Sequence, residues 1–262
     1  MKIAVVTGAS SGIGREFVLA LDREKAYDEI WAVARREERL RALAEECRTP
    51  VRPVPLDLSG DGAAEKLAAM AEEEKAEILM LVNGAGFGLF GEFASLPAKE
   101  QSDMIDLNAK SLTEVTYRLL PYIPRGGRIV NIASNSSWQP VPYMAVYAAS
   151  KAYVMSFSRA LGMELRERGI GVTAVAPGWI KTEFFDRAVR DDTITYYDRF
   201  YTPEQVAVRA MKDVRKGKEV SILGFPVRMQ VRLVKLLPVK FVMNTWCRQQ
   251  GKDGKAKGEK RR

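Results

Sequence analysis

Short apolar segments alternate with longer amphipathic ones along most of the chain. The apolar segments are rich in Val, Ile and Ala and lie at residues 3–6, 30–34, 51–55, 78–82, 128–133, 171–176 and 220–223. Segments of helical periodicity lie at 13–24, 37–47, 61–75, 99–122, 147–168 and 203–216. Strands that are apolar throughout belong to a sheet covered on both faces, and their alternation with helices is typical of parallel βαβ units. The pattern therefore predicts an α/β protein, a single-domain doubly wound parallel sheet of about seven strands with helices on both faces.

The pattern divides the chain into three parts. Residues 1–225 hold all the predicted strands and are expected to form the main domain, which would carry the binding and catalytic sites. Within it, the third strand is predicted at an edge of the sheet because it contains Pro53 and Pro55. Residues 226–250 are predicted to form a basic amphipathic helical segment, and residues 251–262, with Ala256 as their single apolar residue, to be disordered.

The chain contains no histidine and two cysteines, Cys47 and Cys247. The absence of histidine excludes a Ser-His-Asp triad, a Cys-His pair and any imidazole metal ligand, and no metal site is predicted. Two cysteines so far apart suggest neither a disulfide framework nor a thiolate zinc site, which favours a reducing compartment. The first apolar segment follows Met1 and Lys2 directly, without room for a signal peptide, and a cytoplasmic location is expected.

The net charge of +8 comes from the C-terminal end of the chain. Residues 1–227 contain 30 Lys and Arg against 31 Asp and Glu, whereas residues 228–262 contain 11 against 2. A main domain close to neutrality lacks the distributed basic surface of a nucleic-acid-binding protein, and no nucleic-acid partner is predicted.

A glycine-rich turn, residues 7–14 (TGASSGIG), follows the first predicted strand and opens a predicted helix. The free backbone N–H groups and the positive end of the helix dipole at such a turn favour a pyrophosphate. Gly8 would allow the tight turn, Gly12 a close backbone approach, and Gly14 the packing of helix on strand. Because the turn is the first of a βαβ series, it predicts a dinucleotide site in a Rossmann-type fold.

The end of the second predicted strand bears on the choice of dinucleotide. An NAD site usually has an acidic residue about 20 positions after the glycine turn, but Ala34 lies there, followed by Arg35 and Arg36. Two guanidinium groups suit a ribose 2′-phosphate, so NADP(H) is favoured over NAD(H). The alternative is that the two arginines only begin a solvated helix.

A phenol and an ammonium group stand four residues apart in Tyr147-Ala148-Ala149-Ser150-Lys151. In a helix, that spacing puts both side chains on one face. A free tyrosine has a pKa of about 10, and a cation within about 4–6 Å lowers it by stabilising the phenolate. The pair is therefore a candidate acid–base group, although many pairs of this spacing only serve packing.

The order of motifs over residues 1–225 resembles the short-chain dehydrogenase/reductase family. After the glycine turn come Asp57-Leu58, Asn83-Gly84-Ala85-Gly86, Asn108, Ser134, the segment 147–151 (YAASK), and Pro177-Gly178 with Thr182. The sequence departs from the family where Asn83-Gly84 replaces the more usual Asn-Asn.

The resemblance implies an enzyme that interconverts a carbonyl and a secondary alcohol by hydride transfer with a tyrosine as acid and base. Tyr147 would exchange the proton, Ser134 would orient the substrate oxygen, and Lys151 would lower the tyrosine pKa and hold the nicotinamide ribose. Asn108 would position a water that links Lys151 to solvent. The implied and predicted cofactor contacts are Gly8, Ser10, Ser11, Gly12, Ile13, Gly14, Arg35, Arg36, Asp57, Leu58, Asn83, Gly84, Ala85, Gly86, Tyr147, Lys151, Pro177, Gly178, Ile180 and Thr182.

Some of these residues also have plain structural interpretations. Asn108 could bridge neighbouring backbone, Asp57 could form a turn, and Pro177-Gly178 is a common turn dipeptide. Ser136 and Ser137 lie close enough to Ser134 in sequence to be mistaken for it.

Substrate contacts are expected from loops at the carboxyl ends of the strands. These loops contain Phe87, Trp138, Gln139, Tyr143, Trp179, Phe184 and Phe185, and no cluster of Lys or Arg stands among them to hold a carboxylate. An apolar or aromatic carbonyl compound is therefore the predicted substrate.

The segment 226–247 allows three interpretations. Arg228, Arg232 and Lys235 fall on one helical face with apolar residues around them, and Pro238 interrupts the segment. A helix pair over the substrate pocket or at a subunit contact is favoured over a helix on an anionic membrane surface. Charge breaks the segment too often for it to span a bilayer.

The predicted function is thus an NADP(H)-preferring oxidoreductase, and the resemblance implies a homo-oligomer formed through the helices of Asn108 and Tyr147. Two other functions stay open. One is a non-catalytic dinucleotide-binding sensor, which has no need of a proton donor. The other is a membrane- or partner-docking protein that acts through its C-terminal segment.

Overall fold

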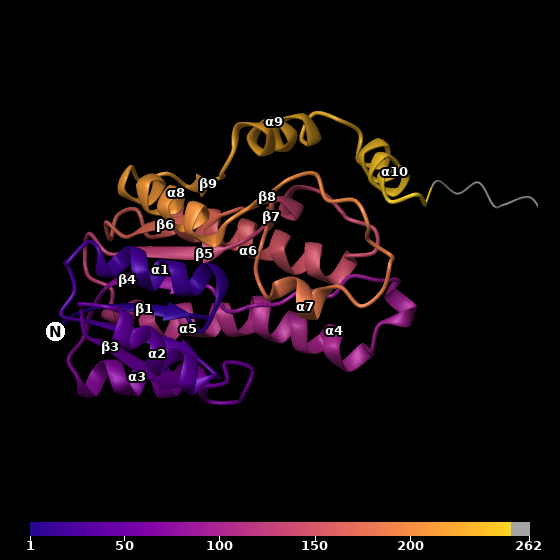
Figure 1. The fold of residues 1–262 in the computed structure, drawn as a ribbon. Coiled ribbons are helices and arrows are strands. Elements are labelled where there is room, and N and C mark those ends of the chain that lie inside the picture. Colours follow the sequence, from indigo (N-terminus) through magenta and orange to yellow (C-terminus); the bar gives the residue numbers. More distant parts are fainter. Residues whose placement is uncertain (253–262) are drawn as a thin grey trace, which may run out of the picture.

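A computed structural model describes residues 1–252 of the chain, with seven strands in one parallel sheet (Figure 1). The strand order is β3-β2-β1-β4-β5-β6-β9, and every neighbouring pair is parallel. The strands are β1 (Lys2–Thr7), β2 (Glu29–Ala34), β3 (Val51–Pro55), β4 (Glu77–Asn83), β5 (Arg128–Ile132), β6 (Gly171–Val175) and β9 (Val220–Ser221). The prediction of a doubly wound parallel sheet with seven strands is confirmed.

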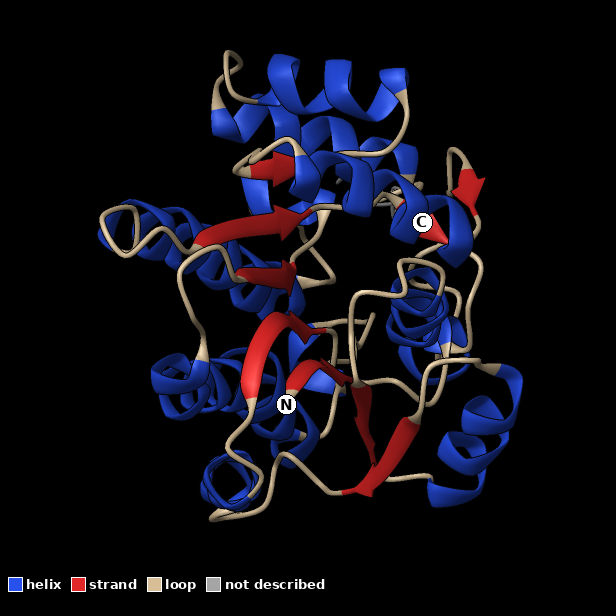
Figure 2. Ribbon diagram, turned by 90° about the vertical axis from the view of Figure 1, so that its left-hand side faces the viewer, coloured by secondary structure: helices blue, strands red, loops and turns tan. Residues whose placement is uncertain are grey.

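Helices cover both faces of the sheet (Figure 2). One face packs on α1 (Gly12–Asp22), α2 (Glu37–Glu46) and α8 (Pro203–Arg215), and the other on α3 (Ala63–Glu73), α5 (Leu112–Leu119) and α6 (Ala145–Glu164). Each face of the sheet has its own hydrophobic core, and alternate residues of β1 point into the two cores. Ala4 and Val6 pack in the core with α1, α2 and α8, and Ile3 and Val5 in the core with α3 and α5. This two-sided burial explains why the strands are apolar throughout.

The sheet reverses its direction of growth between β1 and β4. Thr7, at the end of β1, lies in register with Val33 of β2 and with Asn83 of β4. The loops that follow these three strands therefore leave the sheet side by side. In open α/β sheets, ligands bind at this switch point, outside the carboxyl ends of the strands.

The proline-containing strand β3 lies at one edge of the sheet, as predicted, and the two-residue strand β9 lies at the other. Pro53 and Pro55 lack the N–H that a further strand would need. The two prolines therefore disfavour the pairing of a further strand with β3.

The predicted helix 99–122 is interrupted. It consists of α4 (Ala98–Ile105), a π-helical turn (Asp106–Ser111), α5 and a short 3₁₀ turn (Leu120–Tyr122). The π turn places the Asn108 side chain in the interior, where it bonds the backbone of Phe87. Single π turns inside helices are frequent at functional sites.

Several short elements lie between β6 and α8 and were not predicted, because they are too short to show a period. They are β7 (Trp179–Ile180), which pairs in parallel with β8 (Phe200–Tyr201), and α7 (Phe184–Ala188). Two further short turns, 3₁₀ in type, are Phe93–Ser95 and Asn135–Trp138.

The C-terminal segment forms two helices, α9 (Phe225–Val234) and α10 (Val239–Gln249), which stand apart from the sheet in Figure 1. Pro238 separates them, as its position in the sequence indicated. Within residues 1–252, no helix has the length and apolar content needed to cross a membrane. The predicted disorder of residues 251–262 falls, from residue 253 onward, outside the described residues.

A buried carboxylate fastens α8 to the edge strand β9. Asp213 is 2% exposed and accepts hydrogen bonds from Ser221 Oγ at 2.9 Å and Arg209 Nε at 2.6 Å, and its other oxygen pairs with Lys218 Nζ at 2.8 Å. Burial by itself raises the pKa of Asp213, but the bonds from Lys218, Arg209 and Ser221 together hold that pKa below its usual value.

We expect Asp213→Asn to lower the free energy of unfolding by about 2 kcal/mol at neutral pH, because it removes a charged acceptor from a buried network. Since the folded-state pKa is lowered, the contribution is complete at neutral pH and disappears as the pH falls below about 4. Urea unfolding followed by circular dichroism, at both pH values, measures this. Asp61→Asn, at an exposed position, is the matched control; equal stability of the two variants at neutral pH would contradict the assignment.

Candidate active site

A cavity of about 680 Å³ lies at the carboxyl ends of the strands and extends from the glycine turn to α6 and the C-terminal helices. All predicted cofactor contacts except Asn83 line it: Gly8, Ser10, Ser11, Gly12, Ile13, Gly14, Arg35, Arg36, Asp57, Leu58, Gly84, Ala85, Gly86, Tyr147, Lys151, Pro177, Gly178, Ile180 and Thr182. Ser134 lines it too. Residues from seven separate loops and helices therefore meet in one space.

The glycine turn needs its glycines for close backbone contacts. Gly8 has φ +70°, and a Cβ there would lie 2.7 Å from the backbone of Gly84. A Cβ on Gly14 would lie 2.3 Å from the carbonyl oxygen of Gly8. These contacts press the start of α1 against the ends of β1 and β4, so any side chain at either position would push the turn open.

The N-terminus of α1 is free to receive an anion. The N-cap residue of α1, Ser11, makes no hydrogen bond from its side chain to the helix, and the first turn of α1 contains no acidic residue. The N–H groups of this turn therefore keep their donor capacity beside the cavity, where the helix dipole adds positive potential. A pyrophosphate fits these donors.

A pair of guanidinium groups stands next to the glycine turn. Arg36 donates to Ser10 Oγ at 3.1 Å and to Ser11 Oγ at 2.8 Å, and also to a carboxylate oxygen of Glu183 at 2.8 Å. Arg39 pairs with the other oxygen of the same carboxylate. These bonds from Arg36 and Arg39 lower the pKa of Glu183. The two arginines thus hold one anionic group in common.

The other predicted arginine has a different partner. Arg35 Nη1 lies 3.7 Å from an Asp57 oxygen, and both side chains are exposed. Asp57 also accepts a bond from the Ser59 N–H at 3.0 Å, so it forms a turn as well as lining the cavity. Arg187, which sequence reasoning missed, lines the cavity with its guanidinium 3.3 Å above the Phe87 ring.

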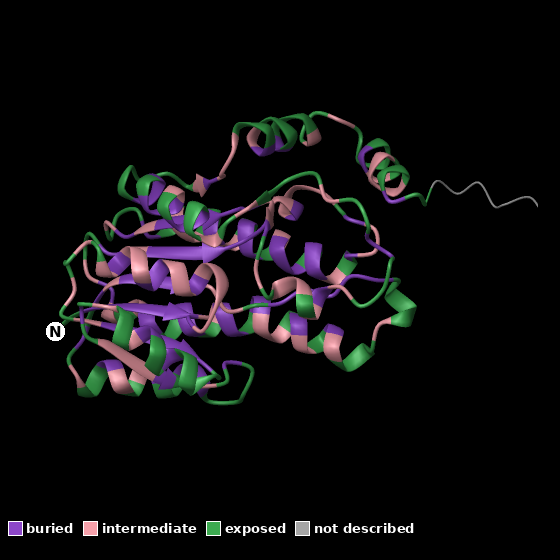
Figure 3. Ribbon diagram, viewed as in Figure 1, coloured by how far each residue is buried: buried purple, intermediate pink, exposed green. Residues whose placement is uncertain are grey.

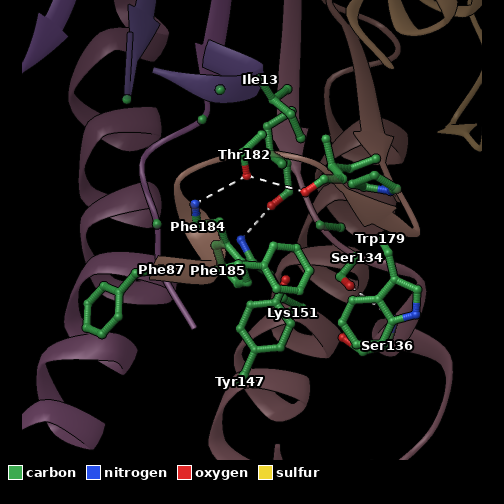
Figure 4. Close-up of a pocket in the computed structure, with 18 of the residues that line it drawn as sticks. Ile13, Phe87, Ser134, Ser136, Tyr147, Lys151, Trp179, Thr182, Phe184 and Phe185 are labelled. Carbon is green, nitrogen blue, oxygen red and sulfur yellow. Dashed lines mark hydrogen bonds between the residues drawn. The ribbon is translucent and has the colours of Figure 1, made fainter. Parts of the chain in front are cut away.

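Ser134, Tyr147 and Lys151 meet at the far end of the cavity (Figure 4). The first two turns of α6 carry Tyr147 and Lys151 on one helical face, and Ser134 lies two residues after the end of β5. All three are buried. Lys151 Nζ donates to the carbonyl oxygen of Ile132 at 2.8 Å and lies 6.0 Å from the centre of the Tyr147 ring. The phenol, the hydroxyl and the ammonium group therefore share one small region of the wall.

Burial dominates the ionisation of this group in the cofactor-free chain. It raises the pKa of Tyr147 to about 12, against the opposing effect of a hydrogen bond with Ser134. It lowers the pKa of Lys151 to about 8. The expected lowering of the Tyr147 pKa by the ammonium group is not seen in the free chain, where burial raises that pKa and only the hydrogen bond with Ser134 opposes it. At neutral pH the phenol is protonated and can donate.

The two predicted asparagines lie behind the cavity rather than in its wall. Asn108 is fully buried; its Oδ1 accepts from the Phe87 N–H at 3.0 Å, and its Nδ2 donates to the Phe87 carbonyl and to Ser150 Oγ. Asn83 Nδ2 donates to Thr116 Oγ1 and Asn131 Oδ1, both at 2.9 Å. Asn83 joins β4 to α5 and β5, and Asn108 joins the loop after β4 to α6. Neither side chain lines the cavity, and the cofactor contact of Asn83 stays a prediction.

Aromatic rings form the wall on the substrate side. Phe90, which sequence reasoning missed, lies 6.0 to 6.3 Å from the rings of Tyr147, Trp179, Phe184 and Phe185. The predicted substrate-side residues line the cavity (Phe87, Trp138, Gln139, Trp179, Phe184 and Phe185) except for Tyr143. Most of this wall is therefore apolar.

Three polar atoms interrupt the apolar wall. Ser136 Oγ, Trp138 Nε1 and Gln139 Oε1 are buried and have no hydrogen-bond partner within the described residues. All three residues line the cavity, around and just after the 3₁₀ turn Asn135–Trp138. Buried polar groups are normally satisfied, so this part of the wall is suited to a polar group of a ligand.

The C-terminal helices close the cavity from above. Val231 and Val234 of α9 and Trp246 of α10 line it. The Trp246 indole donates to the Pro142 carbonyl at 3.0 Å, and Lys235 Nζ lies 3.8 Å above the Trp138 ring. The apolar periodicity of this segment was visible in the sequence, but its position over the cavity depends on these long-range contacts.

Comparison with known proteins agrees with this arrangement. The chain matches the short chain dehydrogenase family over residues 2–193. Sulfoacetaldehyde reductase 2 of Chromohalobacter salexigens is 38% identical over 191 residues, which cover 70% of this chain and 74% of that protein. A short-chain dehydrogenase from Sphingobium yanoikuyae, solved in complex with NADPH, has a TM-score of 0.78 and 29% identity, covering 88% of this chain and 92% of that one. A short chain dehydrogenase/reductase from Burkholderia phymatum, in complex with NAD, shares the fold with a TM-score of 0.77 at 23% identity, over 88% and 92% of the two chains.

The family match covers well over half of the chain, and it includes the glycine turn together with Ser134, Tyr147 and Lys151. The resemblance drawn from the motif order is thereby confirmed. The chain belongs to the short-chain dehydrogenase/reductase family of oxidoreductases.

Proposed function

We propose that the protein is an NADP(H)-preferring oxidoreductase that interconverts a carbonyl compound and a secondary alcohol, with Tyr147 as the acid and base. One observation carries this proposal: a single cavity has an anion-binding helix terminus at one end and a buried phenol, hydroxyl and ammonium group at the other. A nicotinamide dinucleotide would lie between them, held by the glycine turn and by Thr182 and Pro177 along the wall. When bound, it supplies or accepts the hydride.

The chain's own residues supply the proton and the orientation. Tyr147, protonated at neutral pH, donates to the substrate oxygen in reduction and accepts from it in oxidation. Ser134 donates a second hydrogen bond to the same oxygen and fixes its position. Lys151 places a positive charge on the wall beside the phenol and stabilises the phenolate that forms after donation. Asn108 holds the loop after β4 against α6 and thereby sets the distance across the site.

The preference for NADP(H) rests on Arg36 and Arg39. Ala34 ends β2 without the carboxylate that would repel a 2′-phosphate. Arg36 already bonds the Ser10 and Ser11 hydroxyls of the glycine turn, so it stands where the adenosine ribose would lie. The Glu183 carboxylate between Arg36 and Arg39 supports the idea that the pair binds a phosphate, and it would compete with one.

The aromatic wall supports an apolar or aromatic carbonyl substrate. The unpartnered atoms of Ser136, Trp138 and Gln139 favour a compound that carries a second polar group away from its carbonyl. Arg187 stacks on the Phe87 ring and also lies beside Arg36, Arg39 and Arg190, so it stands between the aromatic wall and the phosphate end of the cavity. A panel of ketones and aldehydes, with and without a second hydroxyl, followed by NADPH absorbance, tests this substrate class.

Exposed aromatic residues on α5 and α6 support the homo-oligomer. Tyr117 and Tyr153 are exposed there, and Thr113 Oγ1 joins the two helices by a 2.8 Å bond with the Tyr153 hydroxyl. We propose that this face pairs with a second copy of the chain, which light scattering tests. We also propose that the enzyme is cytoplasmic, which cell fractionation tests. A sensor that only binds the dinucleotide would have no use for the buried Tyr147 and Ser134 pair.

Tyr147→Phe removes only the hydroxyl that donates the proton. We expect turnover to fall by about 10²–10⁴-fold, while the Kd for NADPH changes less than about twofold. Steady-state rates and a titration of NADPH fluorescence measure the two effects. A variant that keeps most of its turnover would show that another group transfers the proton.

The lowered pKa of Lys151 predicts how the rate depends on pH. We expect kcat/KM for NADPH to fall above about pH 8, where the free enzyme loses the ammonium charge. In Lys151→Arg the charge persists to much higher pH, so the alkaline fall should move upward by one unit or more, even if the rate is lower. An alkaline limb at the same pH in both proteins would refute the assignment to Lys151.

Arg36→Ala should weaken NADPH binding by about tenfold or more, since it removes a charge-assisted bond, and leave NADH binding nearly unchanged. Arg35→Ala is the matched control and should have the smaller effect, because Arg35 faces Asp57. Glu183→Gln removes the competing carboxylate and should tighten NADPH binding. Fluorescence titrations measure the Kd of each variant for NADPH and for NADH. An equal loss of affinity for the two cofactors in Arg36→Ala would show that Arg36 does not bind the 2′-phosphate.

A further inference from the structure

The outer face of α9 is an exposed apolar stripe. Phe225, Met229 and Leu233 follow one another at intervals of four residues, which puts them on one side of α9, and Leu236 lies three residues further on, in the turn after the helix. Their side chains are between 43% and 83% exposed. The opposite side carries Val227 and Val231, both 5% exposed, and faces the body of the protein. We call these four residues the outer stripe.

The apolar surface continues beyond α9. Val239 and Phe241, at the start of α10, are more than half exposed. Figure 3 shows α9 as exposed along the side turned away from the sheet, with buried residues below. A single exposed apolar residue needs no explanation, but a contiguous set of them marks an interaction site.

The same segment is positively charged throughout. Residues 220–252 contain no acidic residue and six basic ones: Arg228, Arg232, Lys235, Lys240, Arg248 and Lys252. Within the described part of the chain, none of the six forms an ion pair. Arg228 and Arg232 lie four residues apart along one flank of the outer stripe, whereas Lys235, just after α9, has its Nζ 3.8 Å over the Trp138 ring.

We propose that the outer stripe and the start of α10 dock the enzyme on an anionic lipid surface. A helix whose apolar face is bordered by Lys and Arg lies in the plane of such a surface, with its apolar side chains among the acyl chains and its cations at the headgroups. The charge of the segment is complementary to anionic headgroups. The two helices stand apart from the sheet, so the main domain does not obstruct this contact (Figure 1).

A second copy of the chain fits this surface less well. In a two-fold contact, the same patch faces itself, so the cations of one copy, Arg232 and Lys240 among them, would approach the cations of the other. No carboxylate within residues 220–252 could compensate for that repulsion. An anionic partner avoids it.

Docking here would bring the substrate cavity to the lipid. The inner face of α9 supplies Val231 and Val234 to the cavity wall, while its outer face would rest in the headgroup layer. An apolar carbonyl compound dissolved in the membrane would then enter beneath the same helix, a consequence that rests on the proposed function. Docking itself does not depend on the reaction.

Flotation of the full chain with vesicles tests the proposal. One set contains phosphatidylcholine alone, and the other contains about a third phosphatidylglycerol. We expect at least about tenfold more protein bound to the anionic set, falling as salt is raised. The triple variant Phe225→Ser, Leu233→Ser, Leu236→Ser and the pair Arg232→Gln, Lys240→Gln should each lose most of this binding.

Phe93→Ser, which removes an aromatic residue that is 66% exposed and lies outside the C-terminal helices, is the matched control and should float like the unaltered chain. Turnover of a water-soluble carbonyl compound should be unchanged in the triple variant, so a failure of docking and a failure of the proposed function remain distinguishable. Absence of flotation, equal binding to both vesicle sets, or retained binding by the triple variant overturns the proposal. Loss of a dimer from the triple variant in light scattering, without flotation of the unaltered chain, would assign the outer stripe to a second copy instead.

Discussion

The burial of the Lys151 ammonium without a carboxylate beside it is the constraint on which the site depends. The structure gives this cation a carbonyl oxygen, that of Ile132, and an aromatic ring 6.0 Å away. A buried positive charge without a counter-ion stabilises the ionised, negative form of a neighbouring group. It is held in place because α6 packs on β5 and β6, where the small residues Ala133, Ala174 and Ala176, in these strands or directly after them, leave room for the helix. The packing of α6 on the sheet thus keeps a buried positive charge beside Tyr147, where the proposed reaction would form a phenolate.

Much of this arrangement was predictable from the sequence, because parallel strands impose it. Once β1, β4 and β5 are recognised by their apolar runs, the residues after them must meet at one edge of the sheet. The positions of Gly8, Ser134 and Tyr147 therefore follow from local pattern and strand order. The edge position of β3 follows in the same way from its prolines.

The rest depended on contacts that no local pattern contains. Glu183 lies 147 residues from the arginine it pairs with, and Trp246 lies 104 residues from its Pro142 partner. The π turn around Asn108 exists because a buried amide reaches the backbone of Phe87, and helical periodicity does not report such a turn. The motif order gives the position of Asn83 at the end of β4, but it does not report that its side chain turns into the sheet.

Glu183 stands between the two halves of the cavity. The residue after it, Phe184, begins α7 and lies 5.6 Å from the Tyr147 ring. An anion bound by Arg36 and Arg39 would compete with the Glu183 carboxylate for the same two cations. The proposed nucleotide end and the aromatic chamber therefore share one short segment of chain, in which neighbouring residues face the two ligands.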